Sequence, residues 1–81
     1  MRYNTKGVCS TAIDFEVEND IITSVQFTGG CNGNTQGVAA LVKGMNIDEA
    51  ISRLSGIRCG FRPTSCPDQL ATALKQYKEA N

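Results

Sequence analysis

The chain contains no histidine and no tryptophan among its 81 residues. Without histidine it cannot form Ser-His-Asp or Cys-His nucleophile systems or a His-ligated zinc site, and it lacks the commonest general base. We therefore expect no independent hydrolytic activity, and we expect the chain alone not to be catalytic.

A surplus of charge and long apolar runs are also lacking. Eight Lys and Arg residues balance eight Asp and Glu residues, which argues against nucleic-acid binding because that role needs a basic excess to neutralise phosphates. The apolar runs fall far short of the roughly 18 residues that a membrane span requires, so we expect no membrane role. Residues 1–8 show no apolar signal region and no small-residue cleavage site, which favours a cytoplasmic location.

The length allows one domain over residues 1–81, and no linker or repeat divides it. A core of this size rarely leaves a net stability above about 3 to 5 kcal/mol, so an added cross-link or metal is expected. In a reducing compartment, four cysteines in a small chain are more typical of metal or redox chemistry than of disulfides. In a secreted chain they would instead allow three disulfide pairings.

The hydrophobic pattern predicts an α+β domain: a small antiparallel sheet of two to three strands followed by three helices packed on it. Alternation over residues 9–17 and 22–28 predicts a hairpin with a turn at 18–20, and residues 2–5 fit a short edge strand. Helices are predicted from Asn34-Thr35 to Gly44, from an Asn46 cap to Gly56, and from near Pro67 onward. Their expected core stripes are Val38, Leu41 and Val42; Ile47, Ala50, Ile51 and Leu54; and Leu70, Ala73, Leu74 and Tyr77.

Two hairpin registers compete, and burial decides between them. A two-residue Asn19-Asp20 loop would mix apolar with polar residues on one face, whereas a three- or five-residue loop keeps the faces separate. The favoured register pairs Val17 with Thr23, Phe15 with Val25 and Ile13 with Phe27. Extended outward, it places Cys9 opposite Cys31, with Cα atoms about 4.5 to 5.5 Å apart, which suits two thiolates on one zinc ion.

The other two cysteines flank the start of the last helix. Proline is preferred at the first helical position, so either Ser65 or Cys66 is the expected N-cap. The helix N-terminus carries about half a positive charge, and together with Arg58 and Arg62 it favours a thiolate at Cys66, at Cys59, or at both.

All four cysteines lie at the ends of predicted elements or in loops rich in glycine and proline. Their spacing, Cys9-x21-Cys31-x27-Cys59-x6-Cys66, contains no C-x2-C knuckle, and buried free cysteines that merely fill the core are an alternative interpretation. The placement favours a shared metal site made by Cys9, Cys31, Cys59 and Cys66. Soft thiolates suit both Zn²⁺ and an iron–sulfur cluster.

The pentapeptide Thr64-Ser65-Cys66-Pro67-Asp68 gives the chain a family resemblance. Together with Gly7-Val8-Cys9, Gly29-Gly30-Cys31 and the 54–59 segment, it resembles the TSCPD family of small four-cysteine proteins. A related domain closes the adenosylcobalamin-dependent ribonucleotide reductases. The resemblance implies a metal site, usually zinc, and a possible partner in a ribonucleotide reductase subunit, toward which the chain would act as an accessory.

The chain is also similar, more distantly, to the IscU/NifU-type iron–sulfur scaffold proteins. The matching pieces are Cys9, Gly30-Cys31-Asn32-Gly33, residues 43–50 and Cys66. Thr11 and Ser65 replace an aspartate and a histidine of those scaffolds, and Cys59 is an additional thiol. The resemblance then implies a closed all-cysteine site, which is typical of structural metal rather than of cluster transfer.

A different function is a phosphate- or nucleotide-binding module. The glycine-rich segment 29–34, with Arg58 and Arg62, has the composition of a phosphate-binding loop. Glycine-rich turns before helices also arise from backbone geometry alone, so this alternative stays open beside the metal site.

Overall fold

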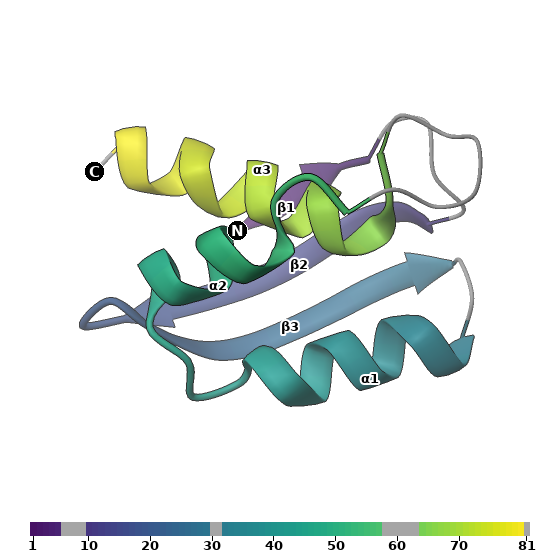
Figure 1. Ribbon diagram of the computed structural model, residues 1–81, viewed down its shortest axis with the longest axis horizontal. Helices are drawn as coiled ribbons and strands as arrows, with labels where there is room; N and C mark the ends of the chain where they lie inside the picture. The colour runs from purple at the N-terminus through teal and green to yellow at the C-terminus, as the bar shows by residue number, and fades with distance from the viewer. Residues whose placement is uncertain (6–9, 30–31, 58–63, 81) are drawn as a thin grey trace.

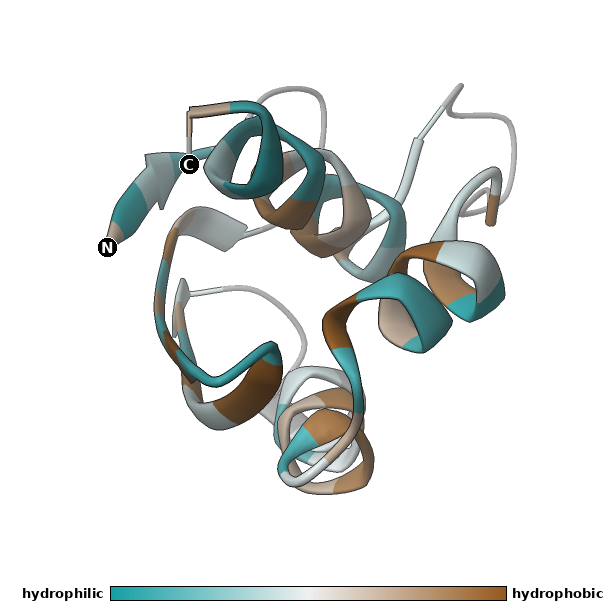
Figure 2. Ribbon diagram, turned by 90° about the vertical axis from the view of Figure 1, so that its left-hand side faces the viewer, coloured by the Kyte–Doolittle hydropathy of each residue, from teal (hydrophilic) through white to brown (hydrophobic). Residues whose placement is uncertain are grey.

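The computed structural model describes residues 1–5, 10–29, 32–57 and 64–80. Three antiparallel strands in the order β1-β2-β3 are followed by three helices, which lie on one side of the sheet (Figures 1 and 2). The predicted α+β arrangement is therefore confirmed. The elements are β1 (Arg2–Asn4), β2 (Ser10–Glu18), β3 (Ile21–Gly29), α1 (Asn32–Val42), α2 (Ile47–Leu54) and α3 (Cys66–Ala80).

The β2–β3 hairpin combines features of both competing registers. Its loop has two residues, Asn19 and Asp20, with φ values of 53° and 64°, and these residue types tolerate the left-handed conformation better than most. One register shift then occurs between Glu16 and Val17. Beyond it, the predicted pairs Phe15–Val25 and Ile13–Phe27 are both present, so the two-residue loop was wrongly rejected.

The shift near the loop corrects one predicted pair. Val17 faces Ile22 rather than Thr23, because Thr23 is the extra residue of a bulge. The bulge moves Ile22 onto the inner face of the sheet, where it is 0% exposed, and leaves Thr23 outside.

A second register shift lies at the other end of the hairpin. It falls between Ser10 and Ala12, so that Ser10 and not Thr11 faces Gly29. Ser10 is consequently buried and Thr11 exposed, the reverse of the predicted alternation. The predicted Cys9–Cys31 pair falls outside the described residues, and the register from which it was extended ends at Ala12.

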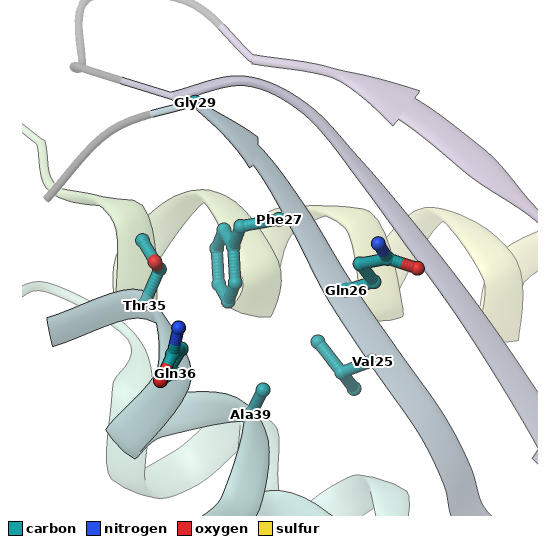
Figure 3. A pocket seen from close by; sticks show the side chains of 7 residues that line it. All are labelled: Val25, Gln26, Phe27, Gly29, Thr35, Gln36 and Ala39. Carbon is teal, nitrogen blue, oxygen red and sulfur yellow. The ribbon is translucent and has the colours of Figure 1, made fainter. Parts of the chain in front are cut away.

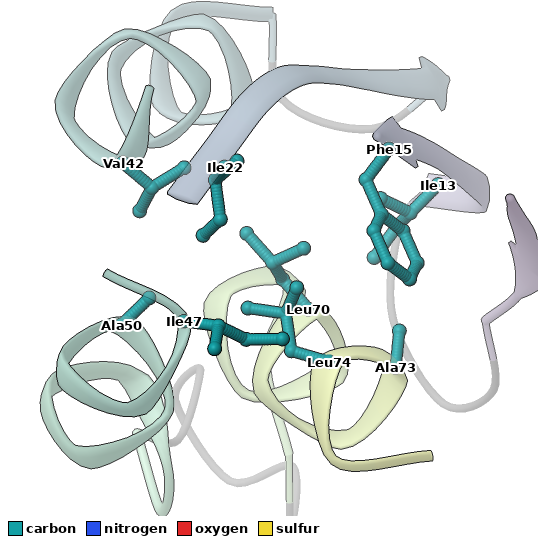
Figure 4. Packing of buried hydrophobic residues seen from close by; sticks show 9 residues of the cluster. All are labelled: Ile13, Phe15, Ile22, Val42, Ile47, Ala50, Leu70, Ala73 and Leu74. Atoms are coloured by element: carbon teal, nitrogen blue, oxygen red, sulfur yellow. The ribbon is translucent and has the colours of Figure 1, made fainter. Parts of the chain in front are cut away.

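The core lies between the inner face of the sheet and the helices (Figure 4). Tyr77 of α3 packs edge-on against Phe15, with ring centroids 6.0 Å apart and an interplanar angle of 83°. The stripes predicted for α2 and α3 all join this cluster or pack against it. Its buried members are Ile13, Phe15, Ile22, Val42, Ile47, Ala50, Leu70, Ala73 and Leu74.

The prediction that Leu41 of α1 belongs to the core is wrong. Leu41 is 76% exposed, whereas Thr35 is 5% exposed and Val42 is 2% exposed. Helix α1 begins at Asn32, earlier than predicted, and it packs mainly on β3. This packing turns Thr35, Val38 and Val42 toward the sheet, and Leu41 lies about 100° away from Val42 around the helix axis.

The ends of α2 agree with the sequence signals. The Asn46 side chain accepts a hydrogen bond of 2.9 Å from the amide of Asp48, which caps the helix as Asn commonly does. Gly56 has φ +84° just after the helix, the left-handed conformation that favours glycine at a C-terminus. In the described part of the chain, none of the helices is long and apolar enough to cross a membrane.

Two glycine substitutions are expected to change stability in opposite directions. An added Cβ at Gly37 or Gly56 would meet no heavy atom within 4 Å, so only backbone conformation matters. Gly37→Ala, inside α1, should stabilise the fold by about 0.5 to 1 kcal/mol. Gly56→Ala should destabilise it by about 1 to 2 kcal/mol because of its positive φ. Urea unfolding of both variants tests this, and a shift of the same sign in both would contradict it.

Candidate metal centre

Cys66 is the first residue of α3 and is 7% exposed. It is the one predicted metal ligand in the described part of the chain, because Cys9, Cys31 and Cys59 fall outside it. Among the described residues, no three Cys, Asp or Glu side chains form a group that could hold a metal ion.

The side chain of Ser10 contacts Cys66 directly. Its Oγ lies 3.2 Å from Cys66 Sγ and shares a hydrogen bond with it, and Ser10 itself is 3% exposed. Ser10 also faces Gly29 across the sheet. The first residue of β2, the last residue of β3 and the start of α3 therefore meet at one end of the molecule (Figure 1).

Sequence reasoning missed Ser10, because the alternation placed it on the solvent face. The register shift at Thr11 turns it inward instead. Its position directly after Cys9 was the available signal, but a bulge of one residue leaves no mark in a hydrophobic pattern.

Ser65 is the N-cap of α3, which decides between the two predicted caps. Its Oγ accepts a hydrogen bond of 3.2 Å from the amide of Asp68, and its carbonyl accepts one of 2.8 Å from the amide of Gln69. The same hydroxyl donates to the carbonyl of Ile57 at 2.6 Å. Ser65 thereby ties the end of the α2 segment to the start of α3.

Asp68 makes a second connection between the same two segments. Its carboxylate accepts a hydrogen bond of 2.7 Å from the amide of Gly56 and another from the hydroxyl of Thr64. The residues before and after segment 58–63 are thus held together at the N-terminus of α3. Segment 58–63, which contains Cys59 together with Arg58 and Arg62 of the predicted phosphate site, is not among the described residues.

A family model described as the TSCPD domain matches residues 1–78. The chain belongs to the TSCPD-domain family. No curated protein and no solved structure matches it. The similarity to iron–sulfur scaffold proteins stays a prediction.

The polar residues of the family pentapeptide have a visible role in this TSCPD domain. Thr64, Ser65 and Asp68 form the hydrogen bonds that fix the start of α3, and Pro67 is buried in its first turn. Cys66 sits among them with its thiol against Ser10. The pentapeptide therefore both presents one thiol and holds the chain around it.

Asp68→Ala should destabilise this TSCPD domain by about 1.5 to 3 kcal/mol, because it removes two hydrogen bonds to a charged acceptor at a half-buried position. Asp14→Ala is the matched control. Asp14 pairs with Arg2 at 2.9 Å on the surface, where such pairs contribute at most about 1 kcal/mol. Urea unfolding measures the stability of both variants. Equal losses would show that the Asp68 hydrogen bonds stabilise the fold no more than an exposed ion pair does.

Proposed function

We propose that this TSCPD domain binds Zn²⁺ or an iron–sulfur cluster through the thiolates of Cys9, Cys31, Cys59 and Cys66. The donor set fits either group, since four soft sulfur ligands suit both. The bound metal would supply a cross-link between four parts of the chain.

The contact between Ser10 and Cys66 carries the proposal. Ser10 Oγ and Cys66 Sγ are 3.2 Å apart although 56 positions separate the two residues in sequence. Cys9 is bonded to Ser10, and adjacent Cα atoms are about 3.8 Å apart. Cys9 therefore directly precedes, along the chain, the residue whose side chain contacts Cys66.

The described neighbours of the remaining two cysteines support the same centre. Cys31 follows Gly29 by two residues, and Gly29 faces Ser10. Cys59 follows Ile57 by two residues, and the carbonyl of Ile57 accepts the hydroxyl of Ser65, next to Cys66. Two residues of chain span at most about 7 Å. Cys31 and Cys59 are therefore each tethered, by at most this length, to a described residue, Gly29 or Ile57, that pairs with a direct neighbour or contact of Cys66.

The surroundings of Cys66 favour a structural role for the metal. The residue is buried and is the first residue of the helix, where the positive end of the helix dipole stabilises negative charge. Four cysteine ligands leave no open coordination position, and closed sites of this kind hold a fold together rather than react.

Metal analysis of natively purified protein, with a visible spectrum, tests the proposal. Aerobic and anaerobic preparations are both needed, because clusters are easily lost. We expect about one zinc per chain in a colourless protein, or iron and sulfide in a brown one. The Cys66→Ser variant should lose most of the metal, whereas the Asp14→Ala variant, altered on the exposed face of the sheet, should retain it. Metal-free wild type from both preparations, or full metal in Cys66→Ser, would refute the proposal.

An accessory role beside a ribonucleotide reductase subunit stays a prediction of the family resemblance. Co-purification of such a subunit with the tagged chain would support it. The metal proposal does not depend on that partner, because a structural site would stabilise the domain alone.

A further inference from the structure

Ser10 and Cys66 form a buried polar contact at the proposed metal centre. Ser10 Oγ lies 3.2 Å from Cys66 Sγ, and the two residues are only 3% and 7% exposed. A cysteine that binds a metal does so as a thiolate, which has no proton to donate. With metal bound, Ser10 is therefore the donor of this hydrogen bond and Cys66 the acceptor.

The backbone amides at the start of α3 are engaged elsewhere. The proline that follows Cys66 has no amide hydrogen. The amide of Asp68 donates to Ser65 Oγ at 3.2 Å, and the amide of Gln69 donates to the Ser65 carbonyl at 2.8 Å. Among the described residues, the hydroxyl of Ser10 is the one group that forms a hydrogen bond with the Cys66 sulfur. Its removal would take this donor from the sulfur at a position that water hardly reaches.

The backbone around Ser10 is fixed by both neighbouring strands. Directly after β1, the amide of Thr5 donates to the carbonyl of Thr11 at 3.0 Å, and the hydroxyl of Thr5 donates to the carbonyl of Ser10. On the other side, Ser10 faces Gly29, which lies at the end of β3 and lines a pocket between β3 and α1 (Figure 3). Gly29 has no side chain that could compete for the hydroxyl across the strand pair. The hydroxyl is therefore held toward Cys66 by the backbone that carries it.

We propose that Ser10 is a positioning residue of the metal centre. Its hydroxyl donates a hydrogen bond to the Cys66 thiolate, holds the sulfur in place for the metal and disperses part of its negative charge. This inference rests on the proposed metal site and adds to it a residue outside the ligand set. Hydrogen bonds to an ionised acceptor are roughly twice as strong as neutral ones, and the loss of such a partner typically weakens metal binding by roughly 10- to 100-fold.

Cobalt binding tests this role, because Co²⁺ occupies thiolate sites that bind zinc and gives a visible spectrum. Co²⁺ is added to metal-free protein under reducing, anaerobic conditions and is then displaced by a chelator of known affinity. Ser10→Ala should bind Co²⁺ roughly 10- to 100-fold more weakly than the wild type. Its sulfur-to-cobalt charge-transfer band should move to longer wavelength, because a sulfur that has lost a hydrogen bond donates electrons more readily. A change in fold stability alone would not move this band.

Thr23→Ala is the matched control for the loss of a hydroxyl. Thr23 is the extra residue of the other bulge, and its exposed hydroxyl donates to the carbonyl of Glu16 at 3.2 Å. This variant should match the wild type in affinity and in spectrum. A wild type that binds no Co²⁺ through sulfur would refute the metal site and this inference with it. A wild type that binds, with a Ser10→Ala variant that matches it in affinity or in band position, would overturn the role of Ser10 alone.

If Ser10→Ala does not fold when loaded with metal, Ser10→Thr and Ser10→Val provide the same comparison. The two replacements have nearly the same shape, and only threonine keeps the hydroxyl. Ser10→Thr should bind Co²⁺ at least about tenfold more tightly than Ser10→Val, and equal binding would overturn the proposal.

Discussion

Removal of the proposed metal by a strong chelator should unfold this protein or leave it only marginally folded. A structural zinc contributes apparent binding free energies of roughly 10 to 16 kcal/mol in small domains. The core of a chain of this size rarely contributes a net stability above about 3 to 5 kcal/mol. The free energy of metal binding would therefore exceed the net stability that the buried hydrophobic cluster of this domain can provide without metal.

Circular dichroism during heating, with and without chelator, measures this effect. A reducing agent must be present, so that freed thiols do not form disulfides. We expect the cooperative transition of the metal-loaded protein to vanish with chelator or to move to a much lower temperature, and to return when equimolar Zn²⁺ is added back, or after reconstitution if the native group is a cluster. A melting temperature that is the same in both conditions would show that the fold does not depend on metal.

Leu74→Ala should lower the free energy of unfolding of the metal-loaded protein by about 2 to 5 kcal/mol. Leu74 lies on α3, is 0% exposed, and belongs to the central cluster with Phe15 and Ile47 (Figure 4). Its truncation removes buried apolar surface and leaves a cavity that the surrounding side chains refill only in part. Urea unfolding of the metal-loaded variant provides the measurement.

Leu41→Ala is the matched control, because it makes the same chemical change at a residue that is 76% exposed. Its effect should stay within about 0.5 kcal/mol, as for most surface substitutions. The comparison also tests the correction at α1, since the hydrophobic pattern placed both leucines in the core. A decrease in the free energy of unfolding as large for Leu41→Ala as for Leu74→Ala would show that Leu41 is buried.

Much of the fold was predictable because the hydrophobic residues of its helices and strands lie mainly on one face of each element. The stripe Leu70, Ala73, Leu74 and Tyr77 follows the period of a helix, and the Asn46 and Gly56 signals mark the ends of α2. The pairs Phe15–Val25 and Ile13–Phe27 were predictable for the same reason, since a slip of one residue would turn apolar side chains outward.

The two bulges of the hairpin could not be read from the pattern. Each shifts the register by one residue, at Thr23 and at Thr11, and threonine suits either face of a strand. A bulge bends its strand and increases the local twist, and where such a bend is needed depends on the tertiary structure. One of them places Ser10 against Cys66, so the contact that carries the metal proposal was also hidden.

The position of Cys66 at the start of α3 was predictable from Pro67, but its surroundings were not. The cap depends on which side chain accepts a hydrogen bond from the amide of Asp68, and that of Ser65 does so. The hydrogen bonds of Asp68 to Gly56 and Thr64 join segments that are up to 12 residues apart. Such links arise only when α2 and α3 pack together, and helical periodicity does not encode them.

X-ray absorption at the metal edge of natively purified protein tests the central claim most directly, because it counts the ligands of the metal. We expect four sulfur neighbours, at about 2.3 Å if the metal is zinc, and a loss of this signal in Cys66→Ser. Metal bound mainly by oxygen or nitrogen, or four sulfur neighbours that persist without Cys66, would contradict the account.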